Sequence, residues 1–323
     1  MKKINLGIIG RNFGYNVAYK AIQKNKIFNV VGFSVKNKSI QKKIPNNVKI
    51  YKNWKELILD KKVNSVLIAS PPQTHKRIIK LSIKNKKHIF CEKPVTTNLN
   101  DITFICNLLK KKKIINYVNY EFGNIEAFNF FKKNYLKKIK ILNIHIDWIM
   151  RIPINKRSDW KDNHSKGGGN FFNYICHILY YLKYLFGEID IISSQIKNTK
   201  NFKLESLILL KKKDIKAKIN FKLVNQKSKE KLFHKIVFLT NKENYILETK
   251  LNNLKDQFQL KKNNKVIFKP KKIKHDFRLK PTFQNLKNFK KNILSKKSSS
   301  PDFNDAKKIH FLINKMIRLS QSK

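Results

Sequence analysis

Short apolar runs alternate with amphipathic stretches over the first 120 residues. Each apolar run has the length of a buried strand, and the stretches between them repeat their apolar positions with helical spacing. We predict strands at 4–9, 30–35, 65–70, 88–91 and 114–119, and helices at 14–25, 54–60, 74–86 and 100–110. The alternation of strand and helix predicts an α/β fold with a doubly wound parallel sheet.

After residue 121 the pattern changes to consecutive strands. A helix at 125–135 precedes a long strand at 138–150, and five further strand-like runs follow between 189 and 249. Asn263-Asn264 between two apolar runs is a hairpin signal, and helices at 283–294 and 305–320 close the chain. We therefore place a domain boundary near residue 120 and predict a first domain over 1–120 and a second α/β domain over 121–323, with an open, mainly antiparallel sheet in the second.

The charge of the chain is unusually positive. Its 323 residues include 72 Lys+Arg and 20 Asp+Glu, so 72 − 20 gives +52, while 41% hydrophobic residues argue against whole-chain disorder. Only six of the 72 are arginine, and the lysines run from Lys2 to Lys323. Because the lysines are spread along the whole sequence, we predict that they reflect a compositional bias of the surface and do not form a specific nucleic-acid site. The positive electrostatic field of such a surface still attracts polyanions at low salt.

Cysteine usage and hydropathy indicate the compartment. Cys91, Cys106 and Cys176 are odd in number and lack metal-site spacing, which favours a reducing cytoplasm and no metal. The most apolar segment, 171–186, contains polar residues and is shorter than the ~20 apolar residues of a membrane helix. We expect no membrane span.

A glycine-bearing turn follows the first strand. In Leu6-Gly7-Ile8-Ile9-Gly10-Arg11-Asn12-Phe13-Gly14, a strand leads through a tight turn into a helix, where backbone N–H groups can bind a dinucleotide pyrophosphate. Asn12 stands where a second glycine is usual, and asparagine tolerates left-handed backbone. The alternative is a buried turn without a ligand.

The end of the second strand carries no acidic residue. An Asp or Glu there usually binds the ribose hydroxyls of NAD, whereas a cation accommodates the 2′-phosphate of NADP. Ser34, Lys36 and Lys38 therefore favour NADP over NAD, unless they only reflect the lysine bias.

Polar residues also follow the third and fourth strands. Ser70-Pro71-Pro72-Gln73-Thr74-His75 is a rigid turn in which Thr74 can cap a helix, and Glu92-Lys93-Pro94 ends the next strand. Open α/β sheets bind ligands at this edge, although both segments are compatible with purely structural roles.

A run of three glycines, 167–169, precedes a predicted helix in a chain with only 9 glycines. Asn173 and His177 follow and lie four residues apart, so they share one face of that helix. A helical histidine in this setting is either a structural residue or a proton-transfer group.

Taken in order, these segments resemble the glucose–fructose oxidoreductase / inositol dehydrogenase / MocA (Gfo/Idh/MocA) family of NAD(P)-dependent oxidoreductases. The resemblance rests on five motifs: G-I-I-G-x-x-x-G, S-P-P-x-T-H, E-K-P, W-K followed by G-G-G-x-x-x-N-x-x-x-H, and Pro301–Ala306 with the last helix. It implies a Rossmann domain, an α/β domain that supports a homo-dimer or homo-tetramer, and hydride transfer between nicotinamide and a hydroxyl-bearing carbon of a sugar, sugar nucleotide or polyol.

The resemblance also implies roles for individual residues. Lys93 and His177 are the expected catalytic residues with Asn173 beside them, Glu92 orients Lys93 or contacts the ribose, and Pro94 follows a cis bond. The expected cofactor contacts are Gly7, Gly10, Arg11, Asn12, Phe13, Gly14, Ser34, Lys36, Ser70, Pro71, Pro72, His75, Glu92 and Lys93, and the expected substrate contacts are Glu121, Arg151, Trp160, Asn173 and His177.

Two positions depart from the family pattern. Asn173 stands where the family often has Asp, and Asn12 interrupts the phosphate loop. The alternative is therefore a cofactor-binding regulatory relative without turnover.

Overall fold

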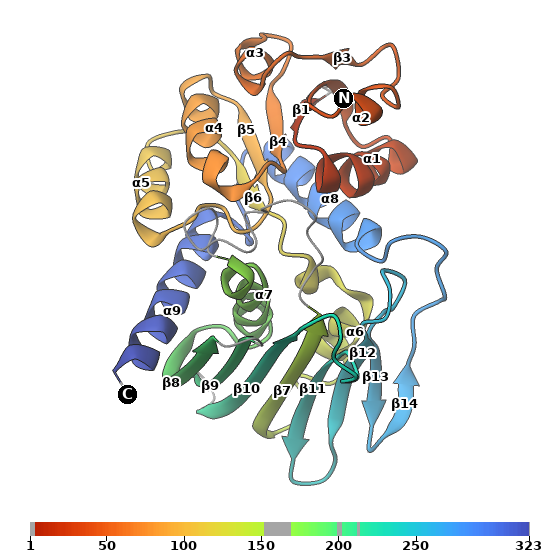
Figure 1. Cartoon of the computed structure of the whole chain (residues 1–323), viewed down its shortest axis with the longest axis vertical. Helices are drawn as coiled ribbons and strands as arrows, with labels where there is room; N and C mark the ends of the chain where they lie inside the picture. Colours follow the sequence, from red (N-terminus) through yellow and green to blue (C-terminus); the bar gives the residue numbers. More distant parts are fainter. Residues whose placement is uncertain (1–3, 152–168, 199–201, 212–213, 323) are drawn as a thin grey trace. The chain divides into compact units, whose positions relative to one another are not determined.

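The computed structural model describes residues 4–151, 169–198, 202–211 and 214–322 (Figure 1). These residues form two compact units. The described part of the first covers 4–121, 169–176 and 278–310, and the second contains the rest.

The first unit is built on a six-stranded sheet in the order β3-β2-β1-β4-β5-β6. Every strand pair in it is parallel. The order reverses between β1 and β4, as in dinucleotide-binding sheets, so the predicted Rossmann fold is confirmed. The strands are β1 (Asn5–Ile9), β2 (Asn29–Ser34), β3 (Lys49–Ile50), β4 (Ser65–Ile68), β5 (His88–Cys91) and β6 (Asn116–Val118).

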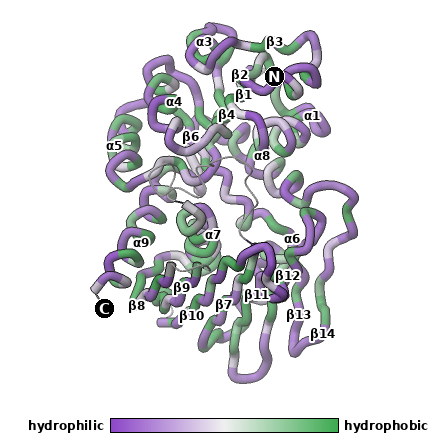
Figure 2. The backbone as a smooth tube through the Cα atoms, in the orientation of Figure 1, coloured by the Kyte–Doolittle hydropathy of each residue, from purple (hydrophilic) through white to green (hydrophobic). Residues whose placement is uncertain are grey.

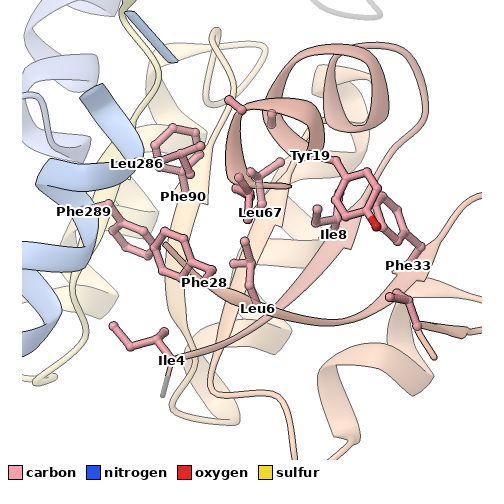
Figure 3. Close-up of a cluster of buried hydrophobic side chains, with 14 of the residues drawn as sticks. Ile4, Leu6, Ile8, Tyr19, Phe28, Phe33, Leu67, Phe90, Leu286 and Phe289 are labelled. Atoms are coloured by element: carbon pink, nitrogen blue, oxygen red, sulfur yellow. The ribbon is translucent and has the colours of Figure 1, made fainter. Parts of the chain in front are cut away.

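Helices cover both faces of this sheet. On one face pack η1 (Gly14–Tyr19), α1 (Lys20–Asn25) and, from far along the chain, α8 (Leu279–Ser295). Figure 3 shows Leu286 and Phe289 of α8 beside Phe28 and Phe90, and the Phe90 and Phe289 ring centroids are 5.6 Å apart. The remaining helices of this region are α2 (Lys38–Gln41), α3 (Trp54–Leu59), α4 (Pro72–Lys84) and α5 (Leu99–Leu109).

The second unit contains an eight-stranded sheet in the order β14-β13-β12-β11-β7-β10-β9-β8. Among the described strands of this sheet only β7 and β10 pair in parallel, so the predicted open, mainly antiparallel sheet is confirmed. Buried residues alternate with more exposed ones along β9 and β10. Along β10, Figure 2 shows a matching alternation of hydropathy. The strands are β7 (Ile141–Arg151), β8 (Ile189–Asn198), β9 (Phe202–Leu210), β10 (Ile215–Val224), β11 (Phe233–Thr240), β12 (Tyr245–Lys250), β13 (Gln259–Lys262) and β14 (Lys265–Phe268).

The local predictions hold with small shifts at most element ends. Asn263 and Asn264 have φ of 46° and 66°, as a two-residue hairpin turn requires. Thr74 is not a helix cap, because α4 already begins at Pro72 and the Thr74 hydroxyl donates to the Pro71 carbonyl. The other helical elements are η2 (Glu121–Asn124), α6 (Glu126–Asn134), α7 (Gly169–Phe186) and α9 (Phe303–Gln321).

Among the residues that the structure describes, no helix is both long and apolar enough to cross a membrane.

Candidate active site

The turn after β1 packs closely against the backbone of Ala69, which is possible only because residue 10 is glycine. Gly10 has φ +122°, and a Cβ at this position would lie 2.3 Å from the backbone oxygen of Ala69. Its N–H donates to the Ser34 carbonyl at 3.2 Å, which joins the ends of β1 and β2. This close approach of backbones is what a dinucleotide-binding turn needs.

The residues after Gly10 continue into a helix. Asn12 lies within it and is not among the residues with positive φ, so the tolerance of asparagine for left-handed backbone is not needed at this position. The missing glycine therefore causes no backbone strain. Arg11 and Asn12 are exposed, Phe13 is half-buried, and a Cβ on Gly14 would lie 3.2 Å from Ile8 Cγ2.

Gly7 has a packing role. It lies inside β1, where a Cβ would meet the side chain of Leu57 at 2.4 Å. At the end of β2, Ser34 is half-buried and Lys36 is exposed. Cofactor contacts at Gly7, Ser34 and Lys36 stay predictions.

His75 is a buried link between two turns. Its Nε2 lies 2.8 Å from the Ser70 carbonyl oxygen, and its Nδ1 lies 3.1 Å from the Pro94 carbonyl oxygen and 3.6 Å from Cys91 Sγ. Burial lowers the pKa of His75 to about 4, so the ring is neutral near pH 7. The Cys91 thiol stays protonated because burial raises its pKa, and it donates to the Glu92 carbonyl oxygen at 3.3 Å.

These contacts leave His75 little capacity to bind a cofactor directly. Its predicted cofactor contact stays untested, and the geometry favours a structural role in holding the turn. Nearby, Ser70 Oγ lies 2.7 Å from Thr74 Oγ1, Pro71 is exposed at the start of α4, and Pro72 is buried.

Lys93 and Asn173, 80 positions apart in sequence, meet in the first unit. The Lys93 ammonium donates to Asn173 Oδ1 at 2.8 Å and to the Asn173 backbone oxygen at 3.1 Å. Asn173 is buried in α7, whose first residue, Gly169, has φ +64°. The bond between Lys93 and Pro94 is cis, as expected. The structure thus brings together the E-K-P tripeptide and the asparagine that follows the glycine run.

Glu92 lies in a polar but buried environment beside Lys93. Asn119 Nδ2 donates to Glu92 Oε1 at 2.6 Å. Burial and the neighbouring carboxylate of Glu121 raise the pKa of Glu92 to about 8. The charge of Lys93, the hydrogen bond from Asn119 and the charge of Arg278 act in the opposite direction and lower this pKa.

Glu121 and Arg278 complete this polar group within the first unit. Glu121 is buried, and its Oε1 accepts from the Thr282 hydroxyl at 3.3 Å. The Arg278 guanidinium lies 5.7 Å from the centroid of the Phe13 ring, in the segment after β1. Arg278 and Thr282 are therefore further residues of this site that the sequence analysis missed.

His177 belongs to the second unit, one turn after Asn173 in the same helix. It is buried, its ring centroid lies 4.9 Å from that of Phe122, and Trp148 is 6.4 Å away. Trp148 in turn stacks on His234 at 4.2 Å. Burial lowers the pKa of His234 to about 3, and the ring lies 3.1 Å from the Tyr181 hydroxyl. This aromatic group was not predicted, because its members come from separate strands and helices.

The other two predicted substrate contacts differ in outcome. Arg151 Nη2 donates to the Ser228 carbonyl at 3.2 Å and Nη1 donates to the Gln226 carbonyl, so its guanidinium holds a turn of the second unit. Its substrate role stays a prediction. Trp160 lies outside the described residues. Over the described ranges, no group of three or more His, Cys, Asp or Glu side chains is arranged to hold a metal ion.

Comparison with family models agrees with this geometry. Residues 4–120 match the model described as "Oxidoreductase family, NAD-binding Rossmann fold", and residues 132–242 match its "C-terminal alpha/beta domain". The chain belongs to the Gfo/Idh/MocA oxidoreductase family. The resemblance drawn from the motifs is thereby confirmed.

Known members of the Gfo/Idh/MocA family resemble the chain to different extents. An uncharacterized oxidoreductase of Synechocystis sp. is 24% identical over 202 residues, covering 60% of this chain and 54% of that protein. The chain therefore spans about half the length of such curated relatives.

Two solved structures share the fold. Levoglucosan dehydrogenase, in complex with NADH and L-sorbose, has a TM-score of 0.79 at 14% identity and covers 100% of this chain and 98% of its own. A 3-ketoreductase from Actinomadura kijaniata, in complex with NADP and TDP-benzene, has a TM-score of 0.79 at 12% identity and covers 98% of both chains.

Both family models leave α8 unmatched, although it lies against the Rossmann sheet. Asn285 of α8 donates to Asn119 Oδ1 at 2.8 Å, and Asn119 in turn binds Glu92. The rarity of arginine is a sequence signal for Arg278, and the asparagines carry none of this kind.

Proposed function

We propose that the protein is an NAD(P)-dependent oxidoreductase that transfers a hydride between nicotinamide and a hydroxyl-bearing carbon of a sugar, sugar nucleotide or polyol. The observation that carries this proposal is the pairing of Lys93 with Asn173 beside the buried Glu92. It places an ammonium group at the carboxyl edge of a Rossmann sheet, where such sheets bind ligands. The sugar-processing dehydrogenases among its relatives support the substrate class.

The residues present fit a dinucleotide. The absence of a side chain at Gly10 leaves the turn close to Ala69, and the helix that follows offers backbone N–H groups for a pyrophosphate. A bound nicotinamide cofactor would supply the hydride acceptor or donor. Ser34 and Lys36 at the end of β2, with no acidic neighbour, favour the 2′-phosphate of NADP.

The proton of the substrate hydroxyl requires a separate acceptor. In the proposed mechanism Lys93 donates a hydrogen bond to the substrate oxygen, and His177 takes or returns the proton. An imidazole suits this work because its ordinary pKa lies near neutrality. Asn173 keeps the Lys93 ammonium oriented, and as an amide it does so without taking part in proton transfer.

The test is a fluorescence titration with NADH and NADPH, followed by a turnover screen with sugars, polyols and nucleotide sugars. Lys93→Ala and His177→Ala should each lower kcat by at least about 100-fold, with cofactor Kd changed by less than about threefold. Lys84→Ala, an exposed lysine of α4, is the matched control. Unchanged turnover in both active-site variants would refute the assignment.

A cofactor-binding regulator without turnover is the second candidate. It is favoured by the neutral Asn173, which leaves Lys93 without a carboxylate at the position where the family often has one. Cofactor binding without turnover across the whole screen would support this candidate. Reproducible hydride transfer would eliminate it.

The proposal extends to assembly and location. We expect a homo-dimer or homo-tetramer formed through the open face of the eight-stranded sheet, and a reducing cytoplasm as the compartment. The three cysteines are buried and form no disulfide, which fits that compartment.

A further inference from the structure

A chain of hydrogen bonds in the first unit runs in one direction and ends on Glu92. Asn288 Nδ2 donates to the Tyr117 hydroxyl at 3.3 Å, and this hydroxyl donates to Asn285 Oδ1 at 3.2 Å. Asn285 Nδ2 donates to Asn119 Oδ1 at 2.8 Å, and Asn119 Nδ2 donates to Glu92 Oε1 at 2.6 Å. Each group thus donates a hydrogen bond to the next one, in the direction of the Glu92 carboxyl. In such an arrangement successive hydrogen bonds polarise one another.

This chain of hydrogen bonds crosses the core of the unit, where a polar group without a hydrogen-bond partner lowers the stability of the fold. Tyr117, Asn119 and Asn285 are fully buried, whereas Asn288 at the start is half-buried. An unsatisfied buried polar group costs about 1–3 kcal/mol. The chain of hydrogen bonds therefore contributes to the stability of the unit and connects α8 with the end of β5.

Several side chains on one face of helix α8 interact with the polar groups around Glu92. Arg278, Thr282 and Asn285 follow the i, i+4, i+7 spacing of one helical face. Thr282 donates to Glu121, and the charge of Arg278 favours the ionised form of Glu92. Because α8 is packed on the sheet through Leu286, this face has a fixed position relative to the E-K-P turn.

The charged and titratable groups around Glu92 come from several elements. Lys93 follows it, Cys91 precedes it, Glu121 comes from the segment after β6, and Arg278 comes from the start of α8. Burial and Glu121 oppose ionisation of Glu92, whereas the donor Asn119 supports it. Loss of the hydrogen bond from Asn285 to Asn119 therefore weakens the hydrogen bond by which Asn119 stabilises the ionised Glu92 carboxyl.

We propose that Asn119 and Asn285 are positioning residues for Lys93, because the one-directional chain from α8 holds the Glu92 carboxyl and with it the E-K-P turn. This inference rests on the proposed function of Lys93. It assigns to α8, which neither family model covers, a role in the site and not only in the core.

Two variants break the chain, and one matched variant does not. Tyr117→Phe removes a single hydroxyl with almost no change in shape, and Asn285→Leu removes the central amide. Asn292→Leu is the control, since Asn292 is also a buried asparagine of α8 but is bonded to Ser299, at 2.9 Å and 3.1 Å. Each variant is measured as the full chain by urea unfolding from pH 6 to 9.

Loss of the chain should destabilise the ionised form of Glu92 more than the neutral form. The ratio of the unfolding equilibrium constant of Tyr117→Phe to that of the wild type should therefore grow about fivefold between pH 7 and pH 9. Asn285→Leu should behave likewise, and in Asn292→Leu the ratio should stay constant. A ratio independent of pH in both chain variants would mean a purely structural role and overturn the proposal.

Two further readouts concern Lys93 itself. With an active substrate, the chain variants should lower kcat about tenfold, leave KM within about twofold, and move the Glu92 limb of the pH profile upward by about one unit. The second readout is the extent of acetylation at Lys93 after treatment with a trace of acetylating reagent, measured by mass spectrometry of the Lys93 peptide. In the variants it should change at least about threefold relative to the extent of acetylation at Lys84. Acetylation and pH profile both unchanged would also overturn the proposal.

The acetylation and unfolding measurements need no turnover. If the wild type turns over no substrate, the proposed function fails, while these two measurements still decide whether the chain controls Glu92 and Lys93.

Discussion

His75 should make the protein sensitive to acid, because its ring is neutral when folded. The unfolded chain binds a proton at the ordinary histidine pKa of 6.5, whereas burial lowers the pKa of folded His75 to about 4. Between these two values the unfolded state binds more protons than the folded state. The contribution of His75 is therefore fully present above about pH 6.5 and is lost as the pH falls toward 4.

The size of this loss follows from the two pKa values. From pH 7 to pH 5 the linkage relation gives a decrease of about 2 kcal/mol in the free energy of unfolding from this one side chain. This is a sizeable part of the 5–15 kcal/mol that typical domains possess. The ring is completely buried, so solvent does not screen this effect.

The measurement compares urea unfolding of the wild type and His75→Gln at pH 5, 6 and 7. Glutamine can still donate to the Ser70 carbonyl but does not titrate, so the variant should lose about 2 kcal/mol less than the wild type over this range. His275→Gln, at an exposed position, is the control and should follow the wild type. Taking differences between proteins removes the contributions of Glu92 and of the other histidines.

An equal loss in His75→Gln and in the wild type would refute the reasoning. It would mean that His75 is protonated in the folded state, with Nδ1 donating to the Pro94 carbonyl as well as Nε2 to Ser70. In that case the ring would carry a positive charge beside the E-K-P turn.

Three further predictions concern the site. Gly10→Ala should weaken NADH binding at least about 100-fold in a fluorescence titration, because the Cβ would lie 2.3 Å from the Ala69 oxygen at φ +122°; wild-type affinity would contradict the assigned turn. Lys36→Ala should raise the Kd of NADPH about tenfold and leave that of NADH unchanged, and equal effects on both would remove the case for NADP. Asn173→Asp should turn the 2.8 Å contact with Lys93 into an ion pair and move the pH optimum of kcat upward; an unmoved optimum would argue against a role for the Lys93 charge.

Local pattern was sufficient for most of the fold. Strands such as Ser65–Ile68 are fully buried and are predicted well by their short apolar runs. The place of α8 was not predictable in this way. Its apolar stripe, which includes Leu286 and Phe289, indicates that it covers a sheet but not which sheet. For the same reason the parallel pairing of β7 with β10, some 70 residues later, could not be predicted.

The sequence motifs singled out some residues of the candidate site and missed others. The E-K-P turn and Asn173 were singled out, and the structure joins them through Lys93. Asn119 and Asn285 were not, since an isolated asparagine carries no periodic signal and its function depends on a partner 166 positions away.

The acidic residues show why the net charge of +52 says little about this site. Many of the carboxylates in the described ranges have specific partners: Asp60 accepts from the Tyr51 hydroxyl at 2.7 Å, Asp190 pairs with Lys315 at 2.7 Å, and Glu121 accepts from Thr282. Surface lysines are screened beyond a Debye length of about 8 Å at physiological ionic strength, whereas the pKa of Glu92 is set by burial and by groups in its immediate surroundings. The chemistry at Lys93 therefore depends on a few buried carboxyl and amide groups, and a lysine-rich surface is compatible with an ordinary oxidoreductase site.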